Sequence, residues 1–338
     1  MESKRQYLLP KTGAFYKTNL HCHTNLSDGQ MSPLEVKEYY LAHGYSVVAF
    51  TEHDIFITHN ELTDDNFLAL NGFEVEINEP NKEVWEETST CHICFVALSE
   101  TVENHPLWHR NQYVGLGNSL DYKGQVKFDE SKPDYVRRYT PERISDMMRV
   151  GRENGFFVTY NHPRWSMETY ERYSQYNGMH AMEIYNTGSV SMGFLDYNPQ
   201  VYDEMLRLGK KIYCIAADDN HSTLDACGGH IMVKAEKLDY KHIADAIARG
   251  SFYSSTGPEI KELWYENGEV HIRCCDAKKI LLSTGIRKQV LVSPEAGQSF
   301  VNEATFRING NEKYFRITVL DREGNFAETN AYFIEDIM

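Results

Sequence analysis

The stretch "TNLHCHTNLSDG", Thr18–Gly29, begins like a β-strand and ends in a polar turn. Its histidines, His21 and His23, stand one residue apart. Residues i and i+2 of a strand point to the same face, so both imidazoles can reach one metal ion from a rigid element. Cys22 then points to the opposite face, where a small buried hydrophobe is expected. Asp28 follows in a turn that can curl back over the end of the strand.

Histidine and acidic residues recur along the chain near the ends of strand-like segments. The pair above is weak alone, because 14 histidines in 338 residues give roughly 0.6 chance occurrences of His-x-His. The further residues are His53 in "FTEHD", Glu74 in "GFEVE", His92 in "CHICF", His162 in "TYNHP", and Asp219 with His221 in "AADDNH". Imidazole and carboxylate ligands suit zinc, manganese or iron. In parallel α/β folds such strand ends meet at one edge, so the sequence predicts a metal centre there.

Strand-like and helix-like segments alternate from about residue 18 to residue 256. In "SPLEVKEYYLAHG", Ser32 suits an N-cap, Pro33 suits the first helical position and Gly44 ends the helix. Further helices are expected in "TPERISDMMRVGRENG", "PQVYDEMLRLGK" and "YKHIADAIARG". The alternation favours βαβ units and parallel strands. About seven strands favour a closed or nearly closed barrel over an open sheet, although periodicity does not distinguish the two.

The sequence pattern changes after "GSFYSSTGPEI", where short strand candidates separated by turn residues replace the predicted helices. Asn267-Gly268 between two strand-like runs predicts a hairpin. We therefore expect an α/β barrel domain over residues 1–258 and a small all-β, β-sandwich-like module over residues 259–338. A long segment of little periodicity, about residues 104–139, is expected to be an insertion that acts as a lid or substrate loop.

Composition narrows the class of protein. The formal net charge is −15 and no basic patch is evident, which argues against long nucleic acid as a partner. No apolar stretch approaches the roughly 20 residues needed to span a bilayer, and the N-terminal residues lack the apolar core of a signal peptide. Seven cysteines, not at zinc-ribbon spacings, fit reduced thiols in a cytoplasmic protein. The oligomeric state is left open.

Taken together, these motifs resemble those of the polymerase-and-histidinol-phosphatase (PHP) superfamily of metal-dependent hydrolases. All nine ligand positions of that family have a match, in the family's order, between Thr18 and about Ser222. "ARGSFYSSTGPEI", followed by a β module, is similar to its carbaryl-hydrolase-like branch of predicted phosphoesterases. The resemblance implies a distorted (β/α)7 TIM-like barrel, the PHP fold, with a trinuclear metal centre at the C-terminal ends of its strands.

The resemblance also distributes the nine ligands over three ions, with Glu74 shared by two of them. The first ion would be held by His21, His23, Asp219 and Glu74. The second would be held by Glu74, His92 and His162. The third would be held by Asp28, His53 and His221. Two to three divalent ions of zinc, manganese or iron are the implied cofactors.

Three acidic neighbours of these ligands need separate interpretation. Glu76 shares a strand face with Glu74 and competes with it, but the family's Gly-x-Glu spacing from Gly72 selects Glu74. Asp218 adjoins Asp219, and the one-residue gap before His221 favours Asp219. Glu52 in "TEHD" replaces a residue that is often aspartate in the family and is not a ligand in this scheme.

A metal-dependent phosphoesterase is the function that this site favours. Three ligand carboxylates bring −3 against up to +6 from three divalent ions, so the pocket suits a small phosphorylated, anionic substrate. A water bridging two ions would be the nucleophile. Arg164, directly after "NHP", and Asn186, at a strand end, are candidate substrate-binding residues. The general acid stays open among His59, His109 and His180, which are in loops and expected to be exposed.

Two rival functions remain. The same centre could cleave a carboxyl ester, carbamate or amide, since the attacking water could also reach a carbonyl carbon. Alternatively, the chain could be a non-catalytic binding or accessory PHP module, although its ligand set is intact. Histidinol phosphatase is a specific candidate, against which the C-terminal β module and the "STGP" stretch argue weakly.

Overall fold

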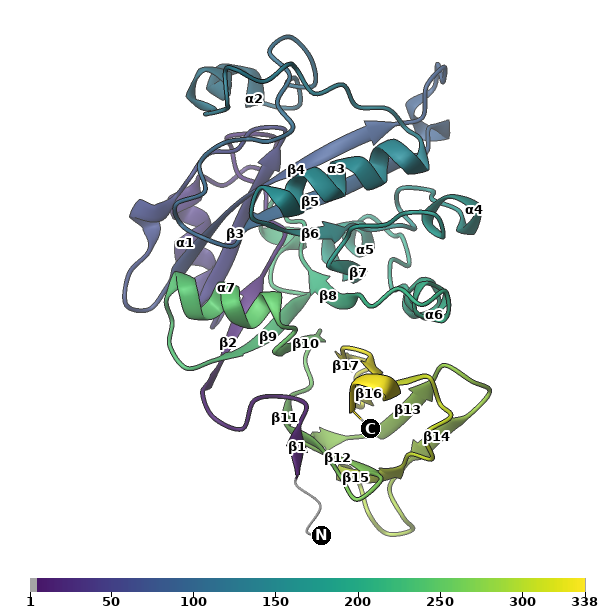
Figure 1. Ribbon diagram of the computed structural model, residues 1–338. Helices are drawn as coiled ribbons and strands as arrows, with labels where there is room; N and C mark the ends of the chain where they lie inside the picture. The colour runs from purple at the N-terminus through teal and green to yellow at the C-terminus, as the bar shows by residue number, and fades with distance from the viewer. Residues whose placement is uncertain (1–4, 338) are drawn as a thin grey trace.

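A computed structural model describes residues 5–337 of the protein (Figure 1). Most of its strands form one mixed sheet, in which each strand pairs with the next in a single path from β14 to β8. The part of this path that carries the predicted ligands runs β9-β2-β3-β4-β5-β6-β7-β8. Its strands are β2 (Ala14–Asn19), β3 (Val47–His53), β4 (Leu68–Asn78), β5 (Thr90–Ala97), β6 (Phe156–Tyr160), β7 (Ala181–Asn186), β8 (Tyr213–Ala217) and β9 (His230–Ala235).

The predicted parallel pairing is present in only part of the sheet. Strands β2, β3 and β4 are parallel, as are β6, β7 and β8, but β5 is antiparallel to both of its neighbours. The connection from β4 to β5 contains only the short 3₁₀ helix η2 (Trp85–Glu87), and a parallel pairing would require a longer crossover. As a result the start of β5 lies at the same edge as the end of β4, with His92 opposite Glu76.

The first and last strands that lead to predicted ligands, β2 and β8, meet just beyond their ends. Cys22, after β2, forms an isolated parallel bridge with Asn220, after β8. The amide of His23 donates to the carbonyl of Asn220 at 3.1 Å, and the amide of Asp219 donates to the carbonyl of His21 at 2.9 Å. A bridge is less than a ladder, so full closure of a seven-stranded barrel stays a prediction. This contact nevertheless brings the predicted metal-binding motif at His21 and His23 next to the one at Asp219 and His221.

The longer helices follow the sequence prediction. They are α1 (Pro33–Ala42), α3 (Pro141–Glu153), α6 (Pro199–Arg207) and α7 (Tyr240–Ala248). Ser32 caps α1 in a capping box with Glu35, and Thr140 caps α3. Short helices occupy the connections, namely α2 (Ser119–Tyr122), α4 (Tyr170–Tyr173), α5 (Thr187–Ser191), α8 (Ile334–Ile337), η1 (Asn60–Leu62), η3 (Lys123–Gln125) and η4 (Thr223–Asp225). None of the described helices is long and apolar enough to cross a membrane.

The C-terminal strands lie at the opposite end of the molecule from α2 (Figure 1). Some extend the main sheet through β10, namely β10 (Phe252–Ser255), β13 (Lys279–Thr284), β14 (Gln289–Val292), β16 (Tyr314–Leu320), β17 (Phe326–Thr329) and β18 (Tyr332–Phe333). The others are β11 (Ile260–Glu266), β12 (Glu269–Ala277) and β15 (Val301–Arg307). They form a second, antiparallel sheet together with the N-terminal strand β1 (Gln6–Tyr7). The predicted hairpin at Asn267-Gly268 joins β11 to β12. The division at residue 258 stays a prediction, because β10 and β17 pair across it.

The predicted insertion, residues 104–139, contains α2 and η3 and packs onto the loops that carry predicted ligands. The amide of Asn118 donates to the carbonyl of Ser27 at 2.7 Å, and the Ser119 hydroxyl donates to the carbonyl of His53 at 3.1 Å. Gly117 has a φ of +54°, and a Cβ there would lie 2.1 Å from the Ser27 carbonyl oxygen. This close approach therefore requires glycine.

Candidate metal centre

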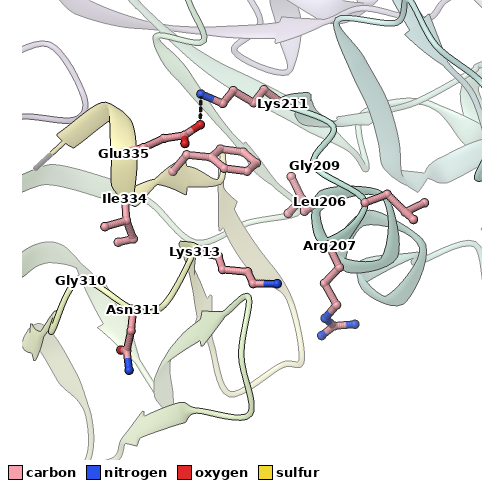
Figure 2. Close-up of a pocket in the computed structure, with 11 residues that line it drawn as sticks. Leu206, Arg207, Gly209, Lys211, Gly310, Asn311, Lys313, Ile334 and Glu335 are labelled. Carbon is pink, nitrogen blue, oxygen red and sulfur yellow. Dashed lines mark ion pairs between the residues drawn. The ribbon is translucent and has the colours of Figure 1, made fainter.

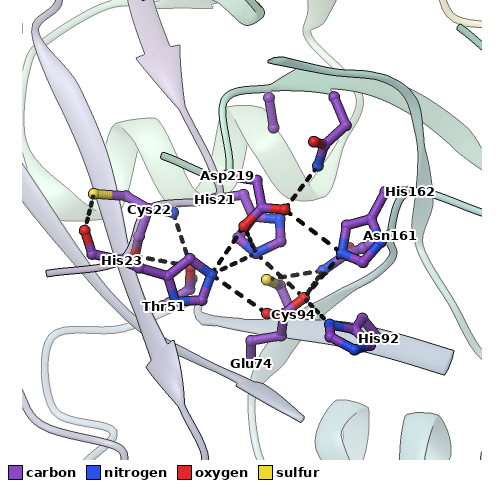
Figure 3. Close-up of polar contacts among 12 residues, drawn as sticks. His21, Cys22, His23, Thr51, Glu74, His92, Cys94, Asn161, His162 and Asp219 are labelled. Atoms are coloured by element: carbon purple, nitrogen blue, oxygen red, sulfur yellow. Dashed lines mark hydrogen bonds and ion pairs between the residues drawn. The ribbon is translucent and has the colours of Figure 1, made fainter. Parts of the chain in front are cut away.

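The four residues assigned to the first ion converge in a buried cluster (Figure 3). The Nε2 atoms of His21 and His23 are 3.1 Å apart, and Oδ1 of Asp219 lies 3.1 Å and 3.0 Å from them. The Glu74 carboxylate completes the group, with Oε1 3.2 Å from His21 Nε2 and Oε2 3.4 Å from His23 Nε2. One ligand atom from each residue lies within 4.8 Å of the others.

The far side of His21 shows which nitrogen carries the proton. Its Nδ1 lies 2.7 Å from Oε1 of Glu183, and both side chains are fully buried. A carboxylate only accepts hydrogen bonds, so Nδ1 is the donor, and a neutral ring would leave Nε2 as an acceptor. That Nε2 faces the oxygens of Glu74 and Asp219, which are acceptors too. A carboxylate behind a histidine in this way is the usual support of a metal-bound imidazole.

The third set of predicted ligands also comes together, and His23 belongs to it as well. His23, Asp28, His53 and His221 form one group whose ligand atoms lie within 4.8 Å of one another. Oδ2 of Asp28 is 3.6 Å from His53 Nε2 and 3.4 Å from His221 Nε2. The imidazole of His23 stacks with those of His53 and His221, whose centroids lie 4.3 Å and 4.6 Å away.

The second set differs in its grouping from the one implied by the resemblance. Oε1 of Glu74 lies 3.3 Å from Nδ1 of His92 and 3.5 Å from Nε2 of His162. The compact groups, however, join His92 with His53 and Glu74, and His162 with His21 and Glu183. Glu74 still lies between the sets. Which nitrogen or oxygen holds which ion stays a prediction.

The polar atoms of this cluster fit divalent metal ions. Several buried atoms have no hydrogen-bond partner, and those in the predicted ligand set are Nδ1 of His23, Oδ1 of Asp28, Nδ1 of His53, Oε2 of Glu74, and both ring nitrogens of His92. Unpartnered buried polar atoms are costly unless something satisfies them. The nitrogen and oxygen donors match zinc, manganese or iron. The residues present can therefore hold such ions.

The electrostatics of the cluster point the same way. Burial lowers the pKa of His23, but its hydrogen bonds to Asp219 and Glu74 outweigh burial and raise that pKa to about 10. Burial also lowers the pKa of His53, and the neighbouring His23 lowers it further, to about 3. The carboxylates thus attract positive charge in a space too crowded for every imidazole to be protonated.

Three residues that support the predicted ligands were missed by sequence reasoning. Glu183, besides contacting His21, accepts a hydrogen bond from the amide of His162 at 3.0 Å. Asn161 Nδ2 donates to Glu74 at 2.9 Å. Glu52 accepts from the amide and hydroxyl of Thr24 and from the hydroxyl of Ser27, and so fixes the turn that leads to Asp28. A carboxylate in an apolar strand was the signal used for Glu74, and "HAMEIYNT" carries the same signal for Glu183.

The acidic residues beside the predicted ligands point in different directions from those ligands. Asp219 faces the histidines, whereas Asp218 accepts hydrogen bonds from the Tyr40 hydroxyl at 2.9 Å and from the amide of Cys227 at 2.8 Å. Asp219 has a φ of +54°, a strained conformation typical of functional sites. The Glu76 carboxylate is partly exposed and lies 3.9 Å from His92 Nε2, outside the compact groups. Cys22 is fully buried in an apolar cluster, as predicted.

The two predicted substrate-binding residues have different surroundings. Arg164 is exposed, three residues along from Asn161. Asn186 is fully buried, and its side-chain amide donates to Glu183 at 2.9 Å and to Asp219 at 3.2 Å, while its oxygen caps α5. Asn186 therefore positions two carboxylates of the centre. Contact of either residue with substrate stays a prediction.

The histidines considered for the general acid also differ. His59 is 4% exposed and packs against Phe50, so the expectation that it is exposed is wrong. Nδ1 of His180 accepts a hydrogen bond from the amide of Val158 at 3.0 Å. His109 packs edge-on against Tyr113, with ring centroids 5.4 Å apart.

No protein-family model and no curated protein matches the chain. Solved structures similar to it include a two-domain protein from Bacteroides vulgatus containing a predicted PHP-like metal-dependent phosphoesterase, with 15% identity, coverage of 97% of this chain and 98% of that chain, and a TM-score of 0.47. A putative metal-dependent phosphoesterase from Bifidobacterium adolescentis has 15% identity, coverage of 71% and 95%, and a TM-score of 0.39. An amidohydrolase from Chromobacterium violaceum with bound sulfate has 16% identity, coverage of 61% and 88%, and a TM-score of 0.37.

Two of these descriptions name the kind of protein that the sequence resemblance predicted. All three TM-scores are below 0.5, so the function has to be inferred from the site itself. The carbaryl-hydrolase-like branch stays a prediction.

Proposed function

We propose that the protein is a metal-dependent hydrolase of the PHP type that cleaves a small phosphate mono- or diester. The observation that carries the proposal is the buried convergence of histidines and carboxylates from the seven strands β2 to β8 and the loops directly after them, with overlapping groups that share His21, His23, His53 and Glu74. Such overlap suits two or three neighbouring ions rather than one. A cytoplasmic location and a small anionic substrate are part of the same proposal.

The balance of charge supports a phosphate ester as the substrate. Glu183, which is fully buried, adds a fourth carboxylate to the predicted Asp28, Glu74 and Asp219. Three divalent ions would still leave the centre net positive, which favours an anionic group over a neutral one. When bound, such ions lower the pKa of water and stabilise negative charge on phosphoryl oxygens.

The protein's own residues hold and orient this centre. Glu183 fixes His21 through its Nδ1 proton, Asn161 fixes one oxygen of Glu74, and Asn186 bridges Glu183 and Asp219. In the proposed hydrolysis, the oxygen of water forms a bond to phosphorus and the bond from phosphorus to the leaving oxygen breaks. A proton passes to that oxygen, so an alcohol departs. Arg164, exposed near the centre, is the proposed clamp for the phosphate group.

Parallel assays of three chromogenic esters test this function. The metal-loaded protein should hydrolyse p-nitrophenyl phosphate or bis-p-nitrophenyl phosphate faster than p-nitrophenyl acetate, and chelation should abolish the activity. Turnover of the acetate alone would point instead to a carboxyl-ester, carbamate or amide hydrolase. If no ester is hydrolysed and the purified protein binds neither manganese nor zinc, the chain is an accessory module.

A further inference from the structure

A pocket of about 340 Å³ lies where the insertion meets the ends of β3 and β4. The insertion contributes residues 113–116 and Arg137, and the strands contribute Asp54, Glu76 and Asn78. The volume is in the range of small-molecule sites, which runs from roughly 300 to 1,000 Å³. Neither the sequence motifs nor the predicted ligands assign any role to this pocket.

The pocket adjoins the metal centre. Asp54 directly follows the predicted ligand His53, and its amide donates to the carbonyl of Glu74 at 2.8 Å. The Glu76 carboxylate, on the opposite wall, has Oε2 3.9 Å from Nε2 of His92. A group attached to a phosphate held at the centre would therefore be next to this pocket.

Arg137 lines the pocket and has one donor atom without a partner. Its Nη1 forms an ion pair with Asp54 and donates to the carbonyl of Glu76 at 3.4 Å. Its guanidinium stacks on the ring of Tyr113, 4.3 Å from the centroid. The residue is only 7% exposed, yet its Nε has no partner within residues 5–337. An unpaired donor on a buried cation indicates a place for a ligand oxygen.

The walls of the pocket are held in place by the fold. Two lining residues that are not glycine have left-handed backbone conformations, Asp54 with a φ of 60° and Tyr113 with a φ of 72°. Such strained residues persist only where their surroundings fix them, and they concentrate at ligand sites. The hydroxyl of Tyr113 also accepts a hydrogen bond from the amide of Arg137 at 3.1 Å. The insertion thus presents a preformed wall.

The charges of the pocket define what it can bind. Arg137 carries one positive charge against the carboxylates of Asp54 and Glu76. A second anionic group on the substrate would meet Glu76, and an apolar group would remove water from the Glu76 carboxylate without replacing its hydrogen bonds. Hydroxyl groups suit the pocket, because they donate to carboxylates and to the carbonyl of Asn78 and accept from a guanidinium. We propose that this pocket binds the leaving group of the phosphoester and selects an uncharged, hydroxyl-rich one, such as a sugar or another polyol.

A second pocket shows the contrast. It has a volume of about 600 Å³ and lies between α6 and the C-terminal strands (Figure 2). Its lining includes the cations Arg207, Lys211 and Lys313, but Lys211 is already paired with Glu335 at 2.7 Å. None of its lining residues belongs to the groups around the metal centre. Of these two pockets, the one at Arg137 adjoins the predicted metal centre.

The proposal rests on the proposed phosphoesterase function, and a ratio of two substrates separates them. The kcat/KM for glucose 6-phosphate relative to that for p-nitrophenyl phosphate should fall at least tenfold in Glu76→Gln, Arg137→Lys and Asn78→Ala. Asn78 is exposed at a strand end, so Asn78→Ala stays informative if Arg137→Lys does not fold. Arg110→Lys is the matched control, because Arg110 forms a similar ion pair with Asp134 in the same insertion but does not line the pocket.

A binding measurement covers the case in which no ester is turned over. Saturation-transfer NMR should detect myo-inositol bound to the metal-loaded wild type and to Arg110→Lys, and a weaker signal in Asn78→Ala. Binding of inositol without hydrolysis of any ester would sink the proposed function but keep the polyol site. An unchanged substrate ratio, no inositol signal, or a preference for ethanolamine and its phosphate would overturn the proposed pocket.

Discussion

Nδ1 of His21 lies 2.7 Å from Oε1 of Glu183, and neither side chain is exposed to solvent. The two residues are 162 positions apart in the chain and meet because β2 and β8 converge next to β7. The contact keeps a proton on Nδ1 of His21, and Nε2 of the same ring faces Asp219 and Glu74. The order of the centre thus depends on a carboxylate that is absent from the nine-residue motif set.

Replacing Glu183 should weaken metal binding although Glu183 is not one of the nine predicted ligands. In Glu183→Gln the amide can still contact His21, but it no longer demands a proton on Nδ1. We expect metal affinity to fall about 10- to 100-fold, the usual effect of losing such a supporting group. Titration calorimetry with zinc or manganese measures this affinity. Glu142→Gln, at an exposed position of α3, is the control. Equal affinity in both variants would mean that Glu183 is only a buried structural acid.

Asp218 and Asp219 are adjacent, but their side chains point in different directions, so substitutions at the two positions should have different effects. Asp219→Asn should lower the metal content of the purified protein by at least one ion and abolish hydrolysis, since Asp219 faces His21 and His23. Asp218→Asn should instead lower the free energy of unfolding, by about 1–3 kcal/mol for each backbone donor left unpaired.

Metal analysis and denaturant unfolding of both variants check this pair together. Asp218 accepts from the amides of Cys227, Gly228 and Gly229, and an asparagine cannot satisfy all three. The reverse pattern, with metal lost in Asp218→Asn and stability lost in Asp219→Asn, would contradict the assignment of ligands.

Glu52 should control one ion selectively. Glu52→Gln replaces one acceptor oxygen by a donor. At Oε2 this donor would face the amide of Thr24 and the hydroxyl of Ser27, and at Oε1 it would face the hydroxyl of Thr24. The turn that carries Asp28 should loosen, so the ion held with His53 should be lost first. Stepwise chelation with metal analysis should show one weakly held ion more than in the wild type. Glu61→Gln, at an exposed side chain of η1 after β3, should behave like the wild type.

The sequence predicted the ligand-bearing strand ends because the physics involved is local. The capping of α1 by Ser32, the burial of Cys22 and the shared face of His21 and His23 all follow from one short stretch each. The hairpin at Asn267-Gly268 is local in the same way. These features require no knowledge of which strands are neighbours.

The remainder depended on pairing between distant strands. The antiparallel placement of β5 could not be deduced from its composition, although the absence of a helix between β4 and β5 was a signal for it. Arg137 looked like one cation in an irregular segment, and only the fold brings it to Asp54, 83 positions away. Supporting residues are recruited across the fold, so their roles appear only when tertiary contacts are known.

His180 provides a test of stability against pH away from the metal centre. Burial, together with the positive charge of Arg152, lowers its pKa to about 4. The amide of Val158 donates to Nδ1 at 3.0 Å, so the folded state requires a ring that is unprotonated at this nitrogen. Between pH 6.5 and about 4 the unfolded chain takes up a proton that the folded protein refuses. The wild type should therefore lose stability as the pH falls through this range.

In His180→Asn the side-chain oxygen can still accept from Val158, but no proton is taken up on unfolding. The melting temperature of this variant should fall less steeply between pH 6.5 and 4 than that of the wild type, with both measured by circular dichroism at fixed ionic strength. The ring also stacks on Phe157, with centroids 4.9 Å apart, so the variant should be less stable at neutral pH. Because that packing loss does not change with pH, only the slope reports the proton. Equal slopes of melting temperature against pH in the two proteins would show that His180 takes up its proton in the folded protein as well. His180 would then be a candidate for the general acid again.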